Sequence, residues 1–272
     1  MKPTFTFLLI FVFCAFISSA QGVFSVSGNA RGSAVGGAGL GFSGAYALPY
    51  NQAGIAESEG TSANASAERR FLLESINGLS ASAVLPTKSG SFGLSMRYFG
   101  FEDYNEQLIG LAYARKLLDR LSLGAQIDYV NLTIPEYGNQ STFTFEIGAQ
   151  LRLSKSLLLG VHTTNPVRAK IIEDEPLPTI LKTGLAYQPT DQVQLFAEVE
   201  KWLDYEARFR GGIEYAPVRQ VMIRTGIATN PVESAFGLGY ALNDMLFFDF
   251  SATYRQLLGF TPGFGIVFKS KK

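Results

Sequence analysis

Apolar and polar side chains alternate along most of the chain from residue 61 onward. The stretch 143–153 reads FTFEIGAQLRL, in which every second residue is apolar, and 91–98, 121–129 and 246–254 follow the same rule. A period of two predicts β-strands, because successive side chains of a strand point to opposite faces. Each run is about 9 to 11 residues long, which is the length that a tilted membrane-spanning strand requires.

Short connections rich in turn residues, such as PTKSG at 86–90, separate these runs. The pattern predicts about 14 strands. They are expected near 61–72, 78–86, 91–101, 105–116, 120–132, 141–154, 156–164, 178–188, 192–202, 207–216, 219–228, 233–242, 245–256 and 260–269. Two segments, 68–76 and 114–121, also fit a short helix. For the second, the alternation on both sides favours two strand ends around a turn at Leu118 and Asp119.

Tyrosine and glycine recur in fixed positions within the runs. The pattern Gly-apolar-x-Tyr occurs at 110–113, 184–187, 212–215 and 237–240, and it places the glycine and the tyrosine on opposite faces. Tyrosines at the ends of apolar faces are Tyr98, Tyr113, Tyr129, Tyr187, Tyr215, Tyr240 and Tyr254. Aromatic rows at both rims are typical of outer-membrane barrels.

The composition favours a membrane barrel over a soluble periplasmic β-protein, which is the alternative. Only 17% of the residues are charged, below the ~25% typical of soluble domains. After the first 20 residues no apolar run reaches the ~18 residues of a membrane helix. Membrane insertion must therefore use strands, and these must close on themselves because an open edge cannot be satisfied in lipid. We expect an all-β, antiparallel transmembrane barrel in the outer membrane, surrounded by its lipid.

The first residues have the features of a secretory signal peptide. Lys2 supplies a positive charge, 5–17 form a short apolar core, and Ser18 and Ala20 fit a small-residue cleavage site. We expect cleavage after Ala20, with residues 1–20 removed. Cys14 is the single cysteine, so the mature chain is expected to have no disulfide, no thiol nucleophile and no cysteine metal ligand.

The segment that follows is rich in glycine and nearly uncharged. Residues 28–56 contain eight glycines and one charged residue, Arg31. The spelling G-x-G-x-x-G at 39–44 lacks the preceding strand and following helix of a nucleotide site. A barrel of about 14 strands is too wide for side chains alone to fill. We therefore expect 21–60 to form a hatch inside a barrel of 61–272, the alternative being a disordered leader.

The polar strand faces then line the lumen. The expected inward charges are Arg97, Arg152, Lys182, Arg208, Arg210 and Arg224, with Asp128, Glu146, Glu198, Glu200, Glu214 and Asp249. Equal numbers favour ion pairs in a filled interior over an ion-selective pore, which needs a ring of one sign. Leu158, Phe196 and Phe247 are apolar and inward, either lining a path for apolar molecules or packing on the hatch.

Several function classes receive no support. The single histidine, His162, has no acidic or thiol cluster around it in the sequence, so neither a metal nor another cofactor is expected. A chain with one histidine and no G-x-S-x-G motif offers no catalytic triad, so we expect no enzyme. Formal charges balance at 23 against 23, which gives no reason to expect nucleic acid.

Two stretches resemble a known family. Residues 30–56, ARGSAVGGAGLGFSGAYALPYNQAGIA, resemble the N-terminal motif of FadL-like outer-membrane proteins, in particular the PorV/PorQ group of Bacteroidetes-type bacteria. Residues 109–129 are similar to a strand–turn–strand of that group. The matching motif residues are Gly36, Gly37, Gly39, Tyr50, Asn51, Ala53 and Gly54. The family usually has proline where this chain has Gln52.

The resemblance implies a fold and two roles. It implies a 14-stranded barrel with an internal N-terminal hatch. PorV/PorQ relatives are accessory proteins of type IX secretion that bind other secretion-system proteins. FadL relatives instead pass hydrophobic small molecules passively across the outer membrane. We expect the secretion-linked role, with FadL-like transport of a hydrophobic ligand as the alternative.

Overall fold

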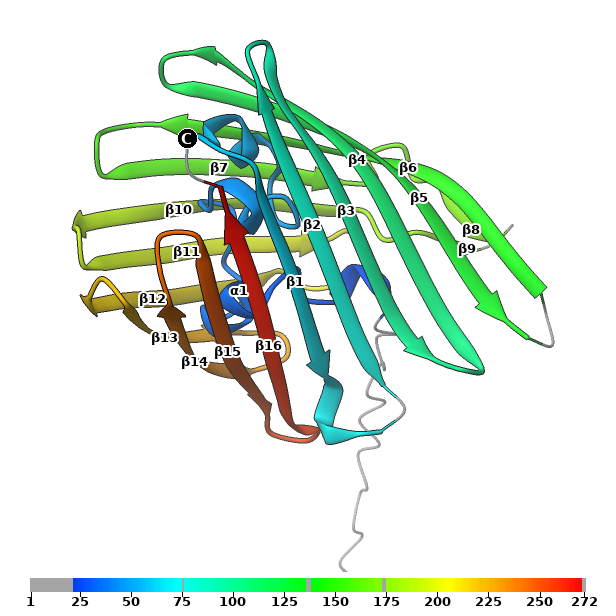
Figure 1. The fold of residues 1–272 in the computed structure, drawn as a ribbon. Coiled ribbons are helices and arrows are strands. Elements are labelled where there is room, and N and C mark those ends of the chain that lie inside the picture. Colours follow the sequence, from blue (N-terminus) through cyan, green and yellow to red (C-terminus); the bar gives the residue numbers. More distant parts are fainter. Residues whose placement is uncertain (1–21, 75, 136–137, 173–174, 271–272) are drawn as a thin grey trace, which may run out of the picture.

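The computed structural model describes residues 22–270, apart from residue 75 and residues 136–137 and 173–174. In that part of the chain, fourteen strands form one closed barrel in which neighbours along the chain pair antiparallel (Figure 1). The predicted fold class, an antiparallel barrel of about 14 strands, is therefore confirmed. The predicted signal peptide, 1–20, lies outside the described residues.

The alternating runs of the sequence are the barrel strands. The strands of the first half are β1 (Ser62–Arg69), β2 (Asn77–Thr87), β3 (Gly90–Phe101), β4 (Tyr104–Leu118), β5 (Leu121–Ile134), β6 (Gly138–Arg152) and β7 (Leu157–Thr164). Those of the second half are β10 (Ile180–Thr190), β11 (Val193–Trp202), β12 (Arg208–Val218), β13 (Val221–Ala228), β14 (Glu233–Ala241), β15 (Leu246–Arg255) and β16 (Gly259–Lys269). Pairing of β1 with β16 closes the ring.

Local backbone chemistry explains where the strands depart from the predicted bounds. The first strand ends at Arg69 rather than at residue 72, because Phe71 and Leu72 adopt φ of 56° and 58°, which no extended strand allows. The chain forms the short 3-10 helix η4 (Arg70–Leu72) there, within the segment 68–76 that also fitted a short helix. The 114–121 segment forms two strand ends as predicted, with Asp119 and Arg120 between them. A small hairpin that the sequence did not predict, β8 (Lys170–Ile172) with β9 (Glu175–Pro176), lies in the connection from β7 to β10.

The two ends of the barrel differ. We call the end where β1 begins and β16 finishes the terminal end, and the opposite one the loop end. Connections at the terminal end are short, such as 88–89 and 119–120, whereas the loop end carries the longer connection 165–179. Outer-membrane barrels have short periplasmic turns and longer extracellular loops. The terminal end therefore matches the periplasmic side.

The outer surface of the ring is apolar. Outward side chains stay exposed although they are large and hydrophobic, for example Leu111 at 61%, Phe143 at 59% and Phe236 at 62%. A surface of this kind is stable in lipid rather than in water. Tyrosines flank the apolar belt: Tyr113, Tyr187, Tyr215 and Tyr240 near the terminal end, and Tyr98, Tyr129 and Tyr254 near the loop end.

No helix in the described part of the chain is long and apolar enough to cross a membrane.

The N-terminal segment, residues 22–60, lies inside the ring of strands (Figure 1). Its short helices are η1 (Val23–Ser25), α1 (Ala30–Ala34), η2 (Gly44–Tyr46) and η3 (Gln52–Glu57). The α1 helix contacts β13 to β16, and η3 contacts β3 to β6, so the segment reaches opposite walls. The segment thus lies in the lumen and contacts both sides of it.

Candidate functional site

The N-terminal segment approaches the barrel wall closely at glycines. A Cβ placed on Gly226 would lie 2.1 Å from the Gly36 nitrogen, and one on Gly212 would lie 2.5 Å from the Val35 oxygen. Gly36 and Gly37 have φ of 70° and 81°, a region that residues with side chains rarely adopt. The chain can turn directly on the wall because the wall has no side chain at Gly212 and Gly226 and the segment has none at Gly36 and Gly37.

Aromatic side chains form the centre of this packing. Phe42 is 1% exposed, and its ring centre lies 5.5 Å from that of Tyr50 and 5.4 Å from that of Phe196, both edge-to-face. Phe247 packs against the same cluster. A Cβ on Gly41 would lie 3.8 Å from Leu158. Of the three residues predicted as an apolar path, Phe196 and Phe247 thus pack against the N-terminal segment, and Leu158 faces Gly41 of the same segment.

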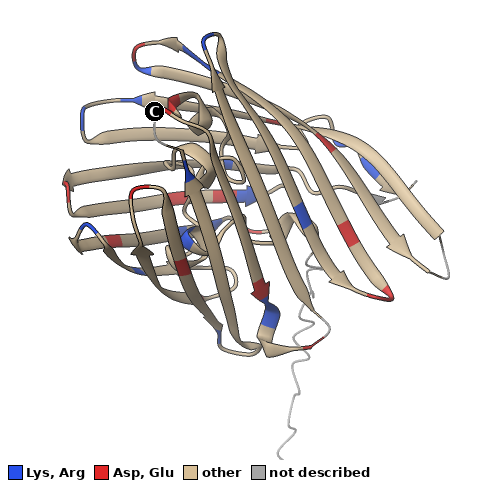
Figure 2. Cartoon of the chain, viewed as in Figure 1, with Lys and Arg blue, Asp and Glu red and all other residues tan. Residues whose placement is uncertain are grey.

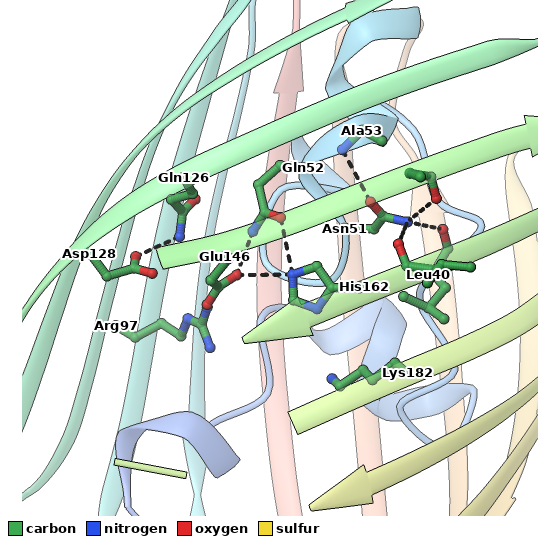
Figure 3. Close-up of polar contacts among 12 residues, drawn as sticks. Leu40, Asn51, Gln52, Ala53, Arg97, Gln126, Asp128, Glu146, His162 and Lys182 are labelled. Atoms are coloured by element: carbon green, nitrogen blue, oxygen red, sulfur yellow. Dashed lines mark hydrogen bonds and ion pairs between the residues drawn. The ribbon is translucent and has the colours of Figure 1, made fainter. Parts of the chain in front are cut away.

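Asn51 fixes the second half of the segment (Figure 3). Its Oδ1 accepts a hydrogen bond of 3.1 Å from the Ala53 nitrogen, and its Nδ2 donates to the Ala149 oxygen of β6 at 3.1 Å. A Cβ on Gly54 would be 2.4 Å from the Phe42 oxygen. The Tyr-Asn-x-Ala-Gly box therefore joins one turn of the segment to the wall and packs without space for larger residues.

A buried polar cluster centres on Glu146 (Figure 3). Its Oε2 accepts a hydrogen bond of 2.5 Å from Gln52 Nε2 and lies 3.2 Å from His162 Nε2. Its Oε1 lies 3.3 Å from Arg97 Nη2. Gln52, at the position where the resemblance suggested proline, thus contacts both the carboxylate and the only histidine of the chain. Such a cluster joins the segment to β3, β6 and β7 through hydrogen bonds and an ion pair.

Three other predicted lumen residues bind their neighbours. Asp128 Oδ1 accepts a hydrogen bond of 2.7 Å from Gln126, on the same strand. Glu198 Oε2 accepts one of 3.4 Å from the Leu40 nitrogen. Arg152, at the terminal end, lies 3.3 Å from Glu57 of the N-terminal segment. Two of the three therefore contact the segment rather than an open lumen.

Arg31 anchors the first half of the segment to the opposite wall. Its guanidinium makes two hydrogen bonds of 2.8 Å to Glu214. Arg224 lies 2.5 Å from Glu214 and 2.6 Å from Asp249, so it pairs with both carboxylates. The Tyr46 hydroxyl donates a hydrogen bond of 2.5 Å to Asp249. Tyr46 belongs to the segment and not to a strand, and burial raises its pKa well above the usual value. The neutral phenol therefore remains a donor.

Further charges lie on the loop-end side of the segment. Two carboxylates are each shared by two cations: Glu200 by Lys182 and Arg210, and Glu233 by Arg208 and Arg255. Figure 2 shows such charges at a few positions within strands that are otherwise uncharged. Glu233 and Arg255 were not among the predicted residues, although the phase of their strands points them inward.

The opposite wall is apolar at the loop end. Inward-facing Phe99, Leu108 and Val130 come from β3, β4 and β5; the deeper inward positions include polar residues on β3 and β5, whereas those of β4 are small, with Ala112 and Ala114 among them. We call the group the loop-end apolar cluster; it consists of Phe99, Leu108, Val130, Val23, Val26 and Leu177. Val23 and Val26 come from the N-terminal segment and Leu177 from the connection before β10. Sequence reasoning missed this cluster.

Across the described residues, no group of three or more His, Cys, Asp or Glu side chains is placed to hold a metal ion.

The arrangement defines a membrane-spanning β-barrel with an ion-paired lumen that contains the N-terminal segment. No protein-family model matches the chain. No curated protein matches it either.

Solved structures share the fold. The toluene transporter TbuX of Ralstonia pickettii is similar with a TM-score of 0.67 and 14% identity, over 90% of this chain and 98% of that one. The toluene transporter TodX of Pseudomonas putida gives 0.66 and 12%, over 91% and 98%. A Pseudomonas aeruginosa FadL homologue gives 0.63 and 13%, over 91% and 98%. The fold is thus that of FadL-like outer-membrane barrels.

Proposed function

We propose that the protein is an outer-membrane channel for small hydrophobic molecules, closed by its N-terminal segment. The observation that carries this proposal is the loop-end apolar cluster. Phe99, Leu108 and Val130 form an apolar wall at the loop end of the lumen, and Val23 and Val26 of the segment belong to the same cluster. An apolar molecule that displaces these two valines gains the same contacts, at about 25 cal/mol for each Å² removed from water.

The comparisons support this transport role more than the secretion-linked role that the N-terminal motif suggested. Two of the similar structures are named as toluene transporters and one as a FadL homologue. No observation on the described residues favours a secretion partner over a hydrophobic ligand. Stoichiometric recovery of secretion proteins from native membranes would return the first role to consideration.

Toluene is a suitable probe for the test. Uptake of radiolabelled toluene is measured in cells that carry the protein in their outer membrane and in cells with an empty vector. Leu108→Asn places a polar amide in the apolar cluster and is expected to lower the uptake, because about 1.5–3 kcal/mol of side-chain burial is lost. Leu117→Asn is the matched control, since Leu117 lies on the same strand but is 53% exposed.

A second change is expected to act in the opposite direction. Val26→Ser weakens the contact between the segment and Leu108 and Val130 without altering the wall, so toluene competes more easily and uptake rises. Uptake equal to that of the empty vector, or equal effects of Leu108→Asn and Leu117→Asn, would contradict the proposal.

A further inference from the structure

A basic cavity lies between the N-terminal segment and a wall formed by β1, β3 and strands of the β10–β16 half, on the loop-end side of the lumen. Its volume is about 110 Å³. Six cationic side chains line it: Arg70, Arg97, Lys182, Arg208, Arg210 and Arg255. Three carboxylates line it, those of Glu68, Glu200 and Glu233. The lining therefore has an excess of positive charge, in a chain whose total charges balance.

The ion pairs leave this excess in place. Glu200 forms ion pairs with both Lys182, at 3.2 Å, and Arg210, at 2.8 Å. Glu233 serves both Arg208 at 3.4 Å and Arg255 at 2.6 Å. One carboxylate cannot neutralise two cations, and buried charges need partners of opposite sign.

Carboxylates just outside the lining reduce the imbalance without removing it. Glu146 lies behind Arg97 at 3.3 Å and is shared with His162. Glu198 is buried nearby and accepts a hydrogen bond from the Leu40 nitrogen. Neither lines the cavity.

Guanidinium donors also stay unused. Arg208 Nε, Arg210 Nε and Arg255 Nη1 are buried and have no hydrogen-bond partner among the residues described. Buried donors are nearly always paired in folded proteins. Hydroxyl groups of Ser27, Ser33, Thr253 and Thr261 line the same cavity. The cavity is therefore rich in hydrogen-bond donors and in positive charge.

We propose that this cavity binds a small oxyanion, a carboxylate or a phosphate, between Arg208, Arg210 and Arg255. Arginine recognises such groups because its planar fork matches two oxygens of a carboxylate or phosphate. The oxyanion is either a free solute or the head group of an amphiphile, since Phe24, Val26 and Phe71 line the apolar side of the cavity. The site does not depend on the proposed transport of hydrophobic molecules, because the arginines and the cavity stand without it.

The chain carries its own reporter for the test. Trp202 is the only tryptophan in the sequence, lines the cavity, and donates a hydrogen bond of 3.0 Å to Glu200. The full-length protein in an uncharged detergent is titrated with inorganic phosphate, acetate, decanoate and decanol. Trp202 emission and titration calorimetry are followed at low and high salt. We expect saturable binding of the anions that weakens as salt increases.

Two variants give effects of opposite sign. Arg208→Gln removes one cation, while Glu233 remains paired with Arg255. We expect it to weaken phosphate binding about tenfold or more, which is the effect of losing a hydrogen bond to a charged group. Glu233→Gln removes a competing carboxylate and should tighten phosphate binding about tenfold, which a merely structural role would not produce. Arg219→Gln is the control, because Arg219 is exposed in a turn at the terminal end.

The two sources are distinguished by comparing acetate with decanoate. Equal affinities identify a free anion as the ligand, whereas much tighter binding of decanoate identifies an amphiphile head group, and both support the site. Decanol binding as tightly as decanoate, phosphate binding unchanged by Arg208→Gln, or no salt-sensitive binding of any oxyanion overturns the proposal.

Discussion

Arg31 makes the contacts whose loss should release the N-terminal segment from the wall. It is the one charged residue within 28–56. It makes two hydrogen bonds of 2.8 Å to Glu214 and one of 3.1 Å to Gln194, and its guanidinium lies 4.4 Å from the centre of the Phe42 ring. The two charged side chains are only 15% and 13% exposed, so solvent screens the pair weakly. Arg31→Gln removes the charge and the fork of donors together.

The expected size of the effect follows from what Glu214 keeps. Breaking a buried ion pair by removing one partner costs about 3–5 kcal/mol, because the other charge stays buried. Glu214 still has Arg224 at 2.5 Å, so the lower value applies. Since 1.4 kcal/mol is a factor of ten, about 3 kcal/mol shifts the equilibrium between docked and undocked segment roughly 100-fold toward the undocked state.

A buried thiol can measure this equilibrium. Val35 is 0% exposed and lies against Gly212 and Gly226, so Val35→Cys reacts with a thiol reagent only when the segment leaves the wall. The experiment uses a Cys14→Ser background, which has no other thiol. Where opening is fast and reversible, the labelling rate follows the undocked population. Arg31→Gln should therefore raise the rate roughly 100-fold, by the same free energy.

The control is an ion pair of the same type on the surface. Arg69 lies 3.6 Å from Glu74, with side chains 46% and 95% exposed, and such pairs contribute about 0–1 kcal/mol. Arg69→Gln should leave the labelling rate nearly unchanged. A rate for Arg31→Gln within about threefold of the parent, less than 1 kcal/mol, would refute the anchoring role. So would a faster rate accompanied by loss of the folded barrel, seen as loss of its heat-dependent gel mobility.

Two further predictions use the same thiol reporter at Val35. Gly226→Ala should undock the segment and raise the labelling rate, because its Cβ would lie 2.1 Å from the Gly36 nitrogen and overpacking costs about 1–3 kcal/mol. Gly211→Ala is the control and should leave the rate unchanged, because a Cβ there points to the other face of the wall and its nearest atom is 3.7 Å away. Equal labelling rates for the two variants would contradict the close-packing argument. Burial raises the pKa of Tyr46 above the usual value of 10.0, so the stability of the neutral phenol is present below pH ~10 and is lost as the pH rises through the folded-state pKa. The labelling rate of Val35→Cys should therefore increase above pH ~10, and the increase should be smaller in a Tyr46→Phe background. An identical pH profile in Tyr46→Phe would show that groups other than Tyr46 cause the increase.

The barrel was predictable because the membrane imposes one rule on every strand. Outward residues such as Leu111 and Phe236 must be apolar because they face lipid, whereas many inward residues are polar. The sequence therefore alternates wherever the chain forms the barrel wall. The rule fails at strand ends, where neither lipid nor lumen constrains the side chains. Phe71 and Leu72 continued the apolar pattern, yet they form a turn with positive φ.

The lumen was predictable only in part, for a different reason. Strand phase tells which residues point inward, and it would also have placed Glu233 and Arg255 there. Strand phase does not tell which inward side chains contact one another. Arg31 and Glu214 are 183 positions apart, and their contact depends on how the segment folds inside a ring that exists only after β1 has paired with β16. The loop-end apolar cluster was missed for the same reason, since its members come from five separate parts of the chain.

Two glycines of the wall, Gly212 and Gly226, are in close contact with the N-terminal segment. A water-filled pore would accept small polar side chains at Gly212 and Gly226, because nothing in open solvent opposes a Cβ. Here a Cβ at either position would collide with the backbone of Val35 or Gly36. Gly36 in turn has a backbone conformation that larger residues resist. At these two positions the surfaces lie so close that the backbone of the segment meets the wall, and side-chain rotation alone does not separate them. We therefore expect a path along this part of the wall to require movement of the segment, which the labelling of Val35→Cys measures.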